Sequence, residues 1–161
     1  MVNSASATFT ENKTMAILEE PLVVSGTLEY HSPDILEKTA LTPMFEKTVL
    51  NGDMIAITRT PGGHAQEFST ASIPQIKELT EGILGTLSGD LPSIQKIYDV
   101  RFSGGRDGWQ LVLVPKGSDV RNLIAWMAIR GHQNHITDID TESTNGDHSE
   151  MTVQDTTVDE K

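Results

Sequence analysis

Two histidines of this chain have a spacing that could support metal binding. His132 and His135 lie three residues apart, and on a helix this spacing would point both rings toward one ion. The segment around them has the composition of a turn, and the other histidines, His31, His64 and His148, also lie in or beside turns. We therefore interpret all five as solvated loop residues and predict no metal site.

Three carboxylates resemble the start of a calcium-binding loop: Asp138, Asp140 and Glu142. Such a loop needs a glycine at its sixth position and a glutamate at its twelfth, where this chain has Ser143 and Ser149. The motif therefore fails. On a strand, alternation would place the three carboxylates on the solvent-facing side, although Ile136 has the same parity and the pattern does not explain it.

The motifs of nucleotide-binding and hydrolytic enzymes are also missing from the sequence. Gly62-Gly63 and Gly104-Gly105 lack the spacing and the following helix of a phosphate loop, so hairpin turns explain them better. The chain has no Gly-x-Ser-x-Gly elbow, and its lack of cysteine excludes thiolate chemistry and disulfides. We predict no catalytic residue and no cofactor, and an enzyme with a scattered polar site remains the weakest alternative.

Composition and charge exclude several kinds of partner. The 161 residues, 37% of them hydrophobic and 22% charged, fit one globular domain. The 12 basic and 23 acidic residues give a formal charge of −11, which disfavours nucleic acid and anionic membrane surfaces. An apolar ligand inside the protein remains compatible with this charge. No apolar run reaches the roughly 18 residues of a membrane span.

Alternating residues separated by turn signals indicate a β-rich domain. Asn51-Gly52 and Asn145-Gly146 are strong hairpin signals. The predicted strands cover Leu22–Tyr30, Ile35–Leu41, Phe45–Leu50, Met54–Thr60, His64–Phe68, Val100–Ser103, Trp109–Val114, Ile124–Ile129, Ile136–Glu142 and Ser149–Gln154. We expect an N-terminal arm or helix over residues 1–20, a single domain over 8–155 and a flexible tail over 156–161.

The middle of the chain, about residues 72–99, changes to helical periodicity. Ser72 starts a capping box, and an apolar stripe that includes Leu79, Ile83 and Leu87 follows it. Gly85 lies inside this helix and weakens it, and Asp90 can cap a second short helix. The helix packs permanently on the sheet, or it forms a movable lid over an apolar groove; the sequence leaves both open.

The order of several motifs resembles the LolA family of periplasmic lipoprotein carriers. The run from Ser25 to Glu37 is similar to that family's "G-T-L … R-P … F" segment, and Val49-Leu50-Asn51-Gly52-Asp53 to its "V-x-D-G" hairpin. Trp109 to Lys116 resembles its "F-x-L-x-P-K" strand, and the segment from Ile129 to Asp147 its last hairpins. The chain departs from the family at Ser32, where the carriers have an arginine, and at Leu36, where they have an aromatic residue.

The resemblance implies a fold, a location and a function. The fold is an unclosed antiparallel β-barrel with helices plugging its concave side. The function is reversible binding of the acyl chains of a lipoprotein or other lipid-linked cargo, received from an inner-membrane exporter and passed to an outer-membrane acceptor. The implied location is the periplasm, although residues 1–7 lack the basic and apolar regions of a signal peptide. The alternative is a non-enzymatic interaction module of an envelope export system without lipid cargo.

Strand parity and the helical stripe assign the residues that would line such a cavity. A register error of one residue would exchange the two faces of a strand. The expected ligand-binding residues are Val24, Leu28, Tyr30, Leu36, Val49, Ile55, Ile57, Leu79, Ile83, Leu87, Trp109, Leu111 and Leu113.

Overall fold

The computed structural model describes residues 2–69, 85, 89–121 and 124–160. In this part of the chain the secondary structure is an antiparallel sheet with two short helices. The strands are β1 (Val2–Thr14), β2 (Leu22–His31), β3 (Ile35–Thr42), β4 (Glu46–Asn51), β5 (Met54–Thr58), β6 (Gln66–Ser69), β7 (Tyr98–Gly105), β8 (Gly108–Pro115), β9 (Ile124–His132), β10 (His135–Ser143) and β11 (His148–Glu160). The helices are α2 (Leu91–Ile97) and α3 (Ser118–Arg121).

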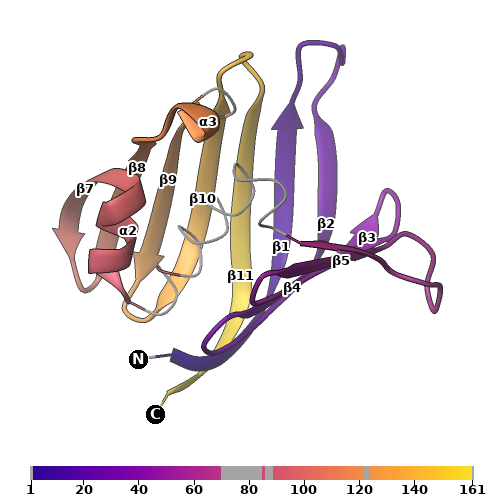
Figure 1. Cartoon of the computed structure of the whole chain (residues 1–161), viewed down its shortest axis with the longest axis horizontal. Helices are drawn as coiled ribbons and strands as arrows, with labels where there is room; N and C mark the ends of the chain where they lie inside the picture. The colour runs from indigo at the N-terminus through magenta and orange to yellow at the C-terminus, as the bar shows by residue number, and fades with distance from the viewer. Residues whose placement is uncertain (1, 70–84, 86–88, 122–123, 161) are drawn as a thin grey trace.

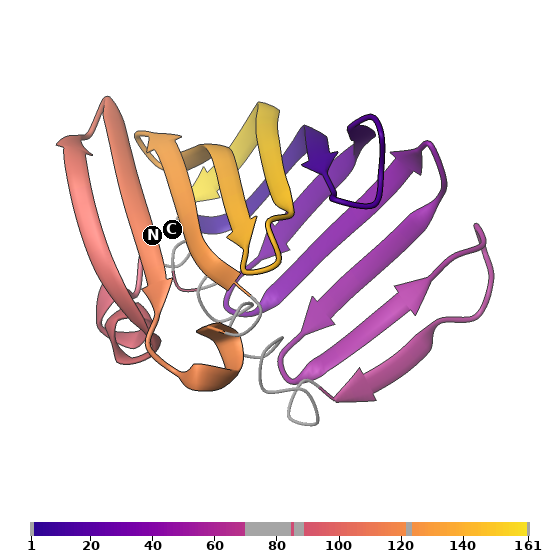
Figure 2. The same ribbon diagram turned by 90° about the horizontal axis from the view of Figure 1, so that it is seen from above.

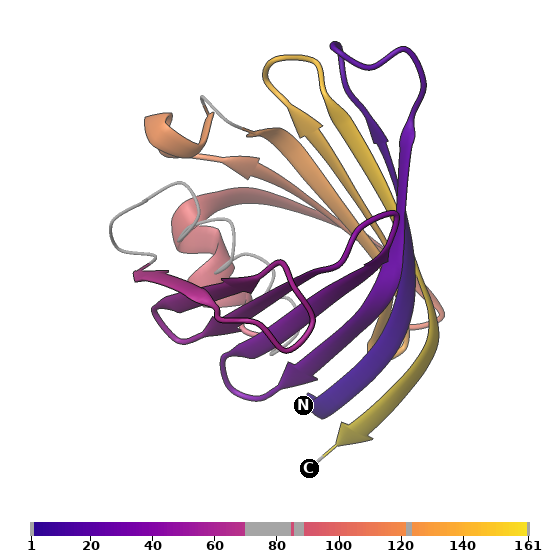
Figure 3. The same ribbon diagram turned by 90° about the vertical axis from the view of Figure 1, so that its right-hand side faces the viewer.

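The sheet consists of two consecutive meanders joined in its centre. Its eleven strands follow the order β6-β5-β4-β3-β2-β1-β11-β10-β9-β8-β7, so the first and last strands of the chain pair with each other (Figure 1). The two edge strands, β6 and β7, lie at opposite sides of the molecule (Figure 2). Figure 3 shows that the sheet curls around the side on which α2 lies. The expected unclosed antiparallel sheet is therefore confirmed.

One face of the curled sheet, here called the inner face, carries the core. Every second residue of each strand points to this face, and the residues paired with them on adjacent strands point to the same side. One buried cluster contains Ile94, Tyr98, Leu111, Leu113, Met127 and Ile129, at the β7–β9 end. A second cluster contains Phe9, Val24, Ala40 and Met151 in the centre. Ile139 packs against both clusters, so β10 links them.

Residues 2–14 form the central strand β1, whereas the sequence predicts a helix or arm over residues 1–20. Small and polar residues dominate this segment, so its alternation is weak. The strand forms because β2 and β11 pair with it along both edges, which outweighs local propensity. The same pairing corrects the expected flexible tail over 156–161, because β11 continues to Glu160 opposite Val2.

The short helix α2 begins where the sequence predicts a cap. Asp90 accepts a hydrogen bond from the backbone amide of Ser93 at 3.3 Å, and Pro92 lies in the first turn. The buried Ile94 packs onto the inner face at the β7–β9 end. None of the helices in the described ranges has the length and hydrophobicity that crossing a membrane requires.

The rest of the predicted lid, except Gly85 and residues 89–99, lies outside the described residues. Gly85 is buried, and a Cβ atom there would lie 2.6 Å from Cγ1 of Ile94. This glycine therefore allows close packing against α2. The sequence instead indicates that Gly85 is a residue that weakens the helix.

A β-bulge explains the parity of Ile136. The register between β9 and β10 shifts between Ile136 and Asp138, so Thr137 is the extra residue. Ile136 and Ile139 consequently both pack on the inner face, although three residues separate them. Asp138 pairs with Arg130 on the outer side of the sheet, where the sequence predicts the carboxylates.

Candidate functional site

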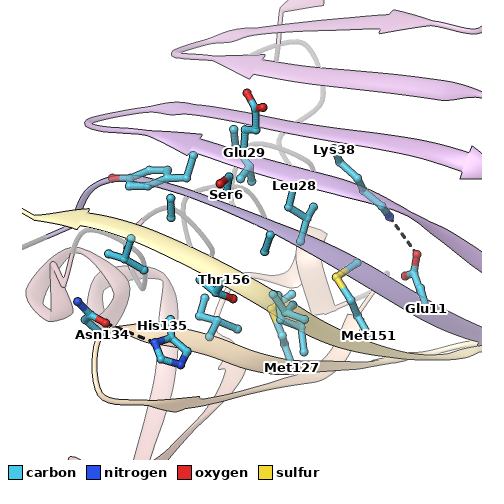
Figure 4. A pocket seen from close by; sticks show the side chains of 18 of the residues that line it. Ser6, Glu11, Leu28, Glu29, Lys38, Met127, Asn134, His135, Met151 and Thr156 are labelled. Carbon is cyan, nitrogen blue, oxygen red and sulfur yellow. Dashed lines mark hydrogen bonds and ion pairs between the residues drawn. The ribbon is translucent and has the colours of Figure 1, made fainter.

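An apolar cavity of about 310 Å³ lies on the inner face in the middle of the sheet. This volume is at the lower end of the range typical of small-molecule sites, roughly 300–1,000 Å³. Both meanders contribute to its wall (Figure 4). The lining residues are Ala5, Ser6, Ala7, Glu11, Leu28, Glu29, Tyr30, Leu36, Lys38, Met127, Asn134, His135, Ile136, Ile139, Thr141, Ser149, Met151, Val153, Thr156 and Val158.

The body of the cavity is formed by aliphatic and thioether side chains. Ala7 pairs with Leu28 across β1 and β2, and the small alanine leaves space beside the leucine. Met127 and Met151 both point into this region (Figure 4). Methionine is flexible and polarisable, so such a wall adapts to an irregular apolar ligand.

One end of the cavity carries an ion pair that the sequence did not indicate. Nζ of Lys38 donates to Oε1 of Glu11 at 3.0 Å and lies 5.3 Å from the ring centroid of Phe9. Oγ of Ser149 donates to Oε2 of Glu11 at 2.5 Å, and Nζ of Lys13 is 4.0 Å from Oε1. The Glu11 side chain is 8% exposed and that of Lys38 is 34% exposed.

The neighbours of Glu11 keep it ionised. Burial would raise the pKa of this carboxyl, but the charge of Lys38 and the hydrogen bonds from Ser149 and Lys38 outweigh burial. The net result is a pKa below the usual value for glutamate. The cavity therefore holds a charged carboxylate and a charged ammonium side by side at one end.

The opposite end of the cavity carries polar, hydrogen-bonding groups. Asn134 and His135 lie together there, with Nδ1 of His135 3.4 Å from Oδ1 of Asn134 (Figure 4). The Tyr30 hydroxyl donates to the carbonyl oxygen of Pro33 at 3.4 Å. Burial and the nearby charge of Asp34 raise the pKa of Tyr30, so its hydroxyl stays protonated.

Three of the residues expected in the ligand site line this cavity: Leu28, Tyr30 and Leu36. Others share the inner face but lie elsewhere on it. Val24 belongs to the central cluster, and Leu111 and Leu113 to the cluster near α2. Trp109 packs against that second cluster.

The remaining expected residues lie farther toward the β6 edge or outside the described ranges. Ile55 is buried opposite Leu50, and Ile57 pairs with Thr48. Leu79, Ile83 and Leu87 fall among the residues that the structure does not describe.

Val49 requires a correction, because its strand register differs from the expected one by one residue. It pairs with Glu37 and Ala56 on the outer side. Leu50 has the inner position and is buried opposite Leu36 and Ile55.

Two charged clusters lie away from the cavity on the outer side of the sheet. His148 places Nδ1 2.5 Å from Oε2 of Glu142 and Nε2 3.2 Å from Oε1 of Glu150. The Glu142 hydrogen bond, opposed by burial and helped by Glu150, raises the pKa of His148.

The second outer cluster groups three residues with ligand atoms within 4.8 Å of one another: Glu29, His31 and Glu37. Glu29 and His31 are exposed, and Glu37 pairs with Lys47 at 3.4 Å. Surface carboxylates commonly gather in this way, so we assign this cluster no ligand.

Comparison with known proteins identifies the family. The model of the family described as "Outer membrane lipoprotein carrier protein LolA-like" matches residues 2–159. The chain belongs to this LolA-like family. The match extends over nearly all of the sheet, so the family assignment covers the strands that form the cavity.

Comparison with solved structures concerns the fold alone. A LolA superfamily protein from Nitrosomonas europaea superimposes with a TM-score of 0.52 at 11% identity, covering 99% of this chain and 87% of the other. A putative outer membrane lipoprotein-sorting protein domain from Vibrio parahaemolyticus has a TM-score of 0.46 at 8% identity, covering 97% and 85%. At these identities the first likeness shows the LolA-like fold. No curated protein gives a significant match to the sequence.

Proposed function

We propose that this LolA-like protein is a periplasmic carrier that reversibly binds the acyl chains of a lipoprotein or other lipid-linked cargo. The observation that carries the proposal is the apolar cavity on the inner face, with walls of aliphatic and methionine side chains. The cavity lies at the junction of β1 and β11, so both halves of the chain would contribute to binding.

The physical chemistry of such a carrier is simple. Each methylene group of an acyl chain that leaves water contributes about 0.8 kcal/mol. A few buried methylenes therefore give binding that is favourable but reversible, and no bond needs to form or break. The proposed carrier would take its cargo from an inner-membrane exporter and release it to an outer-membrane acceptor.

We further propose that the helical segment over residues 72–99 covers the cavity. The support comes from the described part of this segment, where Ile94 of α2 packs on the inner face.

A second candidate function, an interaction module without lipid, has one observation in its favour. The edge strand β7 leaves one side unpaired in the described sheet, and its Phe102 side chain is 63% exposed. An exposed strand edge with an apolar side chain can add a strand from a partner. The open cavity favours the carrier, because an interaction module needs no internal space.

The carrier proposal is tested by fatty-acid uptake. Delipidated protein should bind a fluorescent fatty acid, and Leu28→Glu should weaken the uptake at least about tenfold by placing a charge in the cavity. Thr27→Glu adds the same charge to the exposed outer side of β2 and should bind like the wild type.

A second variant separates binding from folding. Ala7→Leu adds apolar volume beside Leu28, so it should reduce uptake without lowering the thermal midpoint. If the wild type takes up no fatty acid, or if Leu28→Glu and Ala7→Leu bind like the wild type, the carrier proposal is wrong. Lipid extraction of protein purified from its native periplasm should also recover a co-purifying acyl lipid.

A further inference from the structure

The inference concerns the ion pair at one end of the cavity, and it rests on the proposed carrier function. In a protein with a formal charge of −11, this end of the cavity carries more positive than negative charge. Lys38 and Lys13 supply two ammonium groups around one carboxylate, Glu11, giving a local sum of +1. Glu29 also lines the cavity, but its carboxylate points away and lies 3.7 Å from Nε2 of His31 (Figure 4).

The Lys38 ammonium has hydrogen-bonding capacity left for a ligand. An ammonium carries three N–H donors, and one of them is used on Glu11. Among the described residues, the other close neighbour of Nζ is the face of the Phe9 ring, which accepts no conventional hydrogen bond. At 34% exposure the side chain can reach into the cavity without being taken out of a packed core.

Glu11 can remain satisfied when Lys38 contacts a ligand. Its Oε2 atom keeps the hydrogen bond from Ser149, and Lys13 lies 4.0 Å from Oε1. Glu11 therefore serves to hold the unoccupied Lys38 in position rather than to neutralise it permanently. Stability is weak evidence for why the pair is present, because replacing a buried ion pair by apolar residues of similar volume is often neutral or stabilising.

We propose that Lys38 binds the anionic head group of an amphiphile whose apolar tail occupies the cavity. The head group lies at Lys38 beside Glu11, and the tail runs along Leu28, Ile139 and Met151 toward His135. A bound carboxylate balances the local sum of +1, whereas a monoalkyl phosphate, which carries close to two negative charges at pH 8, exceeds it by about one. The substrate class is therefore an acidic lipid, such as a fatty acid or a monoalkyl phosphate, rather than a neutral acyl ester.

The proposal is tested by competition at pH 8. An uncharged environment-sensitive dye occupies the cavity, and dodecanoic acid, dodecyl phosphate and methyl dodecanoate compete for it, all below their micelle concentrations. Wild-type protein should bind one or both acids about tenfold more tightly than the methyl ester, as a charge-assisted hydrogen bond predicts. The ratio between the two acids identifies the head group.

Variants assign the preference to Lys38. Lys38→Met should reduce the ratio of acid to ester affinity to about one while ester binding stays unchanged, and Lys38→Arg should restore the ratio. Lys47→Met is the matched control, because Lys47 pairs with Glu37 on the outer side. Glu11→Gln should retain acid binding, because the amide oxygen can still accept the hydrogen bond that positions Lys38 while a competing anion is removed.

The outcomes separate this proposal from the carrier function. Equal affinities of acids and ester in the wild type, or an unchanged preference in Lys38→Met, would overturn the head-group assignment and leave acyl binding intact. Failure of all three competitors to displace the dye would overturn both proposals.

Discussion

The Nζ atom of Lys38 lies 3.0 Å from Oε1 of Glu11, and the two residues come from strands that are not adjacent. Strand β2 separates them in the sheet order, so the pair spans the inner face above Val24 and Leu28. On the inner face of their strands, Lys38 lies between Leu36 and Ala40, and Glu11 lies between Phe9 and Lys13. This relationship gives the cavity one charged end, so its two ends differ chemically.

The ion pair predicts a specific acid sensitivity. Because the folded pKa of Glu11 is below its usual value, its stabilisation is present above the unfolded pKa of about 4.3 and is lost as pH falls through the lower folded pKa. Glu11→Gln should lose about 1–2 kcal/mol at pH 7 and show a shallower decline between pH 5 and pH 3. Thermal unfolding across this range measures both effects.

Glu20→Gln provides the control for this change, because Glu20 is exposed in the turn between β1 and β2. It should follow the wild-type curve. If the stability of Glu11→Gln declined with falling pH in parallel with that of the wild type, the ionised Glu11 carboxylate would not be the source of the acid sensitivity.

The outer cluster around His148 predicts the opposite dependence on pH. The folded pKa of His148 is raised, chiefly by its hydrogen bond with Glu142, so its stabilisation is full below the unfolded pKa of about 6.5. It is lost as pH rises through the folded pKa. His148→Gln should therefore lower the free energy of unfolding more at pH 6 than at pH 8.5, by up to about 1 kcal/mol at the lower pH, as thermal unfolding at the two pH values would measure.

His64→Gln is the matched control, since His64 is exposed in the turn before β6. Equal losses for His148→Gln at pH 6 and pH 8.5 would mean that packing against Trp126, with ring centroids 6.0 Å apart, accounts for its contribution instead of charge.

Close packing of Trp109 on β9 predicts that Gly131 tolerates no side chain. A Cβ atom at Gly131 would lie 2.0 Å from Cζ2 of Trp109 and 2.6 Å from the carbonyl oxygen of His135. Gly131→Ala should cost about 1–3 kcal/mol and shift the tryptophan emission, because the indole must leave its hydrogen bond to Gln133. Gly105→Ala, with no atom within 4 Å of the added carbon, should leave stability and emission unchanged. An unshifted emission in Gly131→Ala would contradict this packing.

Much of the sheet could be predicted because most strands alternate clearly and end at recognisable turns. β2 to β5 and β7 to β10 have the expected order, and the Asn51-Gly52 hairpin joins β4 to β5. β1 could not be predicted, since Ala5 and Ala7 differ little in polarity from the serines and threonines between them. Its pairing partner β11 lies at the other end of the chain, which local patterns do not reveal.

The cavity was harder to predict than the sheet. Parity identified Leu28, Tyr30 and Leu36, but it concealed Lys38, which occupies an inner position between Leu36 and Ala40. A charged residue at an inner-face position breaks the apolar–polar alternation, and the sequence alone does not show the ion-pair partner that accounts for it. Ile136 and Ile139 were hidden for another reason, because the bulge at Thr137 changes the parity between them.

The separation of the edge strands β6 and β7 has a mechanical consequence. In a closed barrel, the number of strands and their stagger fix the diameter, so the interior has one size. An open sheet has no such constraint, and its twist can relax or tighten while every interstrand ladder stays intact. We expect the width of the inner face to adjust to the thickness of a bound ligand. The elastic strain of this adjustment would be spread over the ten strand pairs of the described sheet.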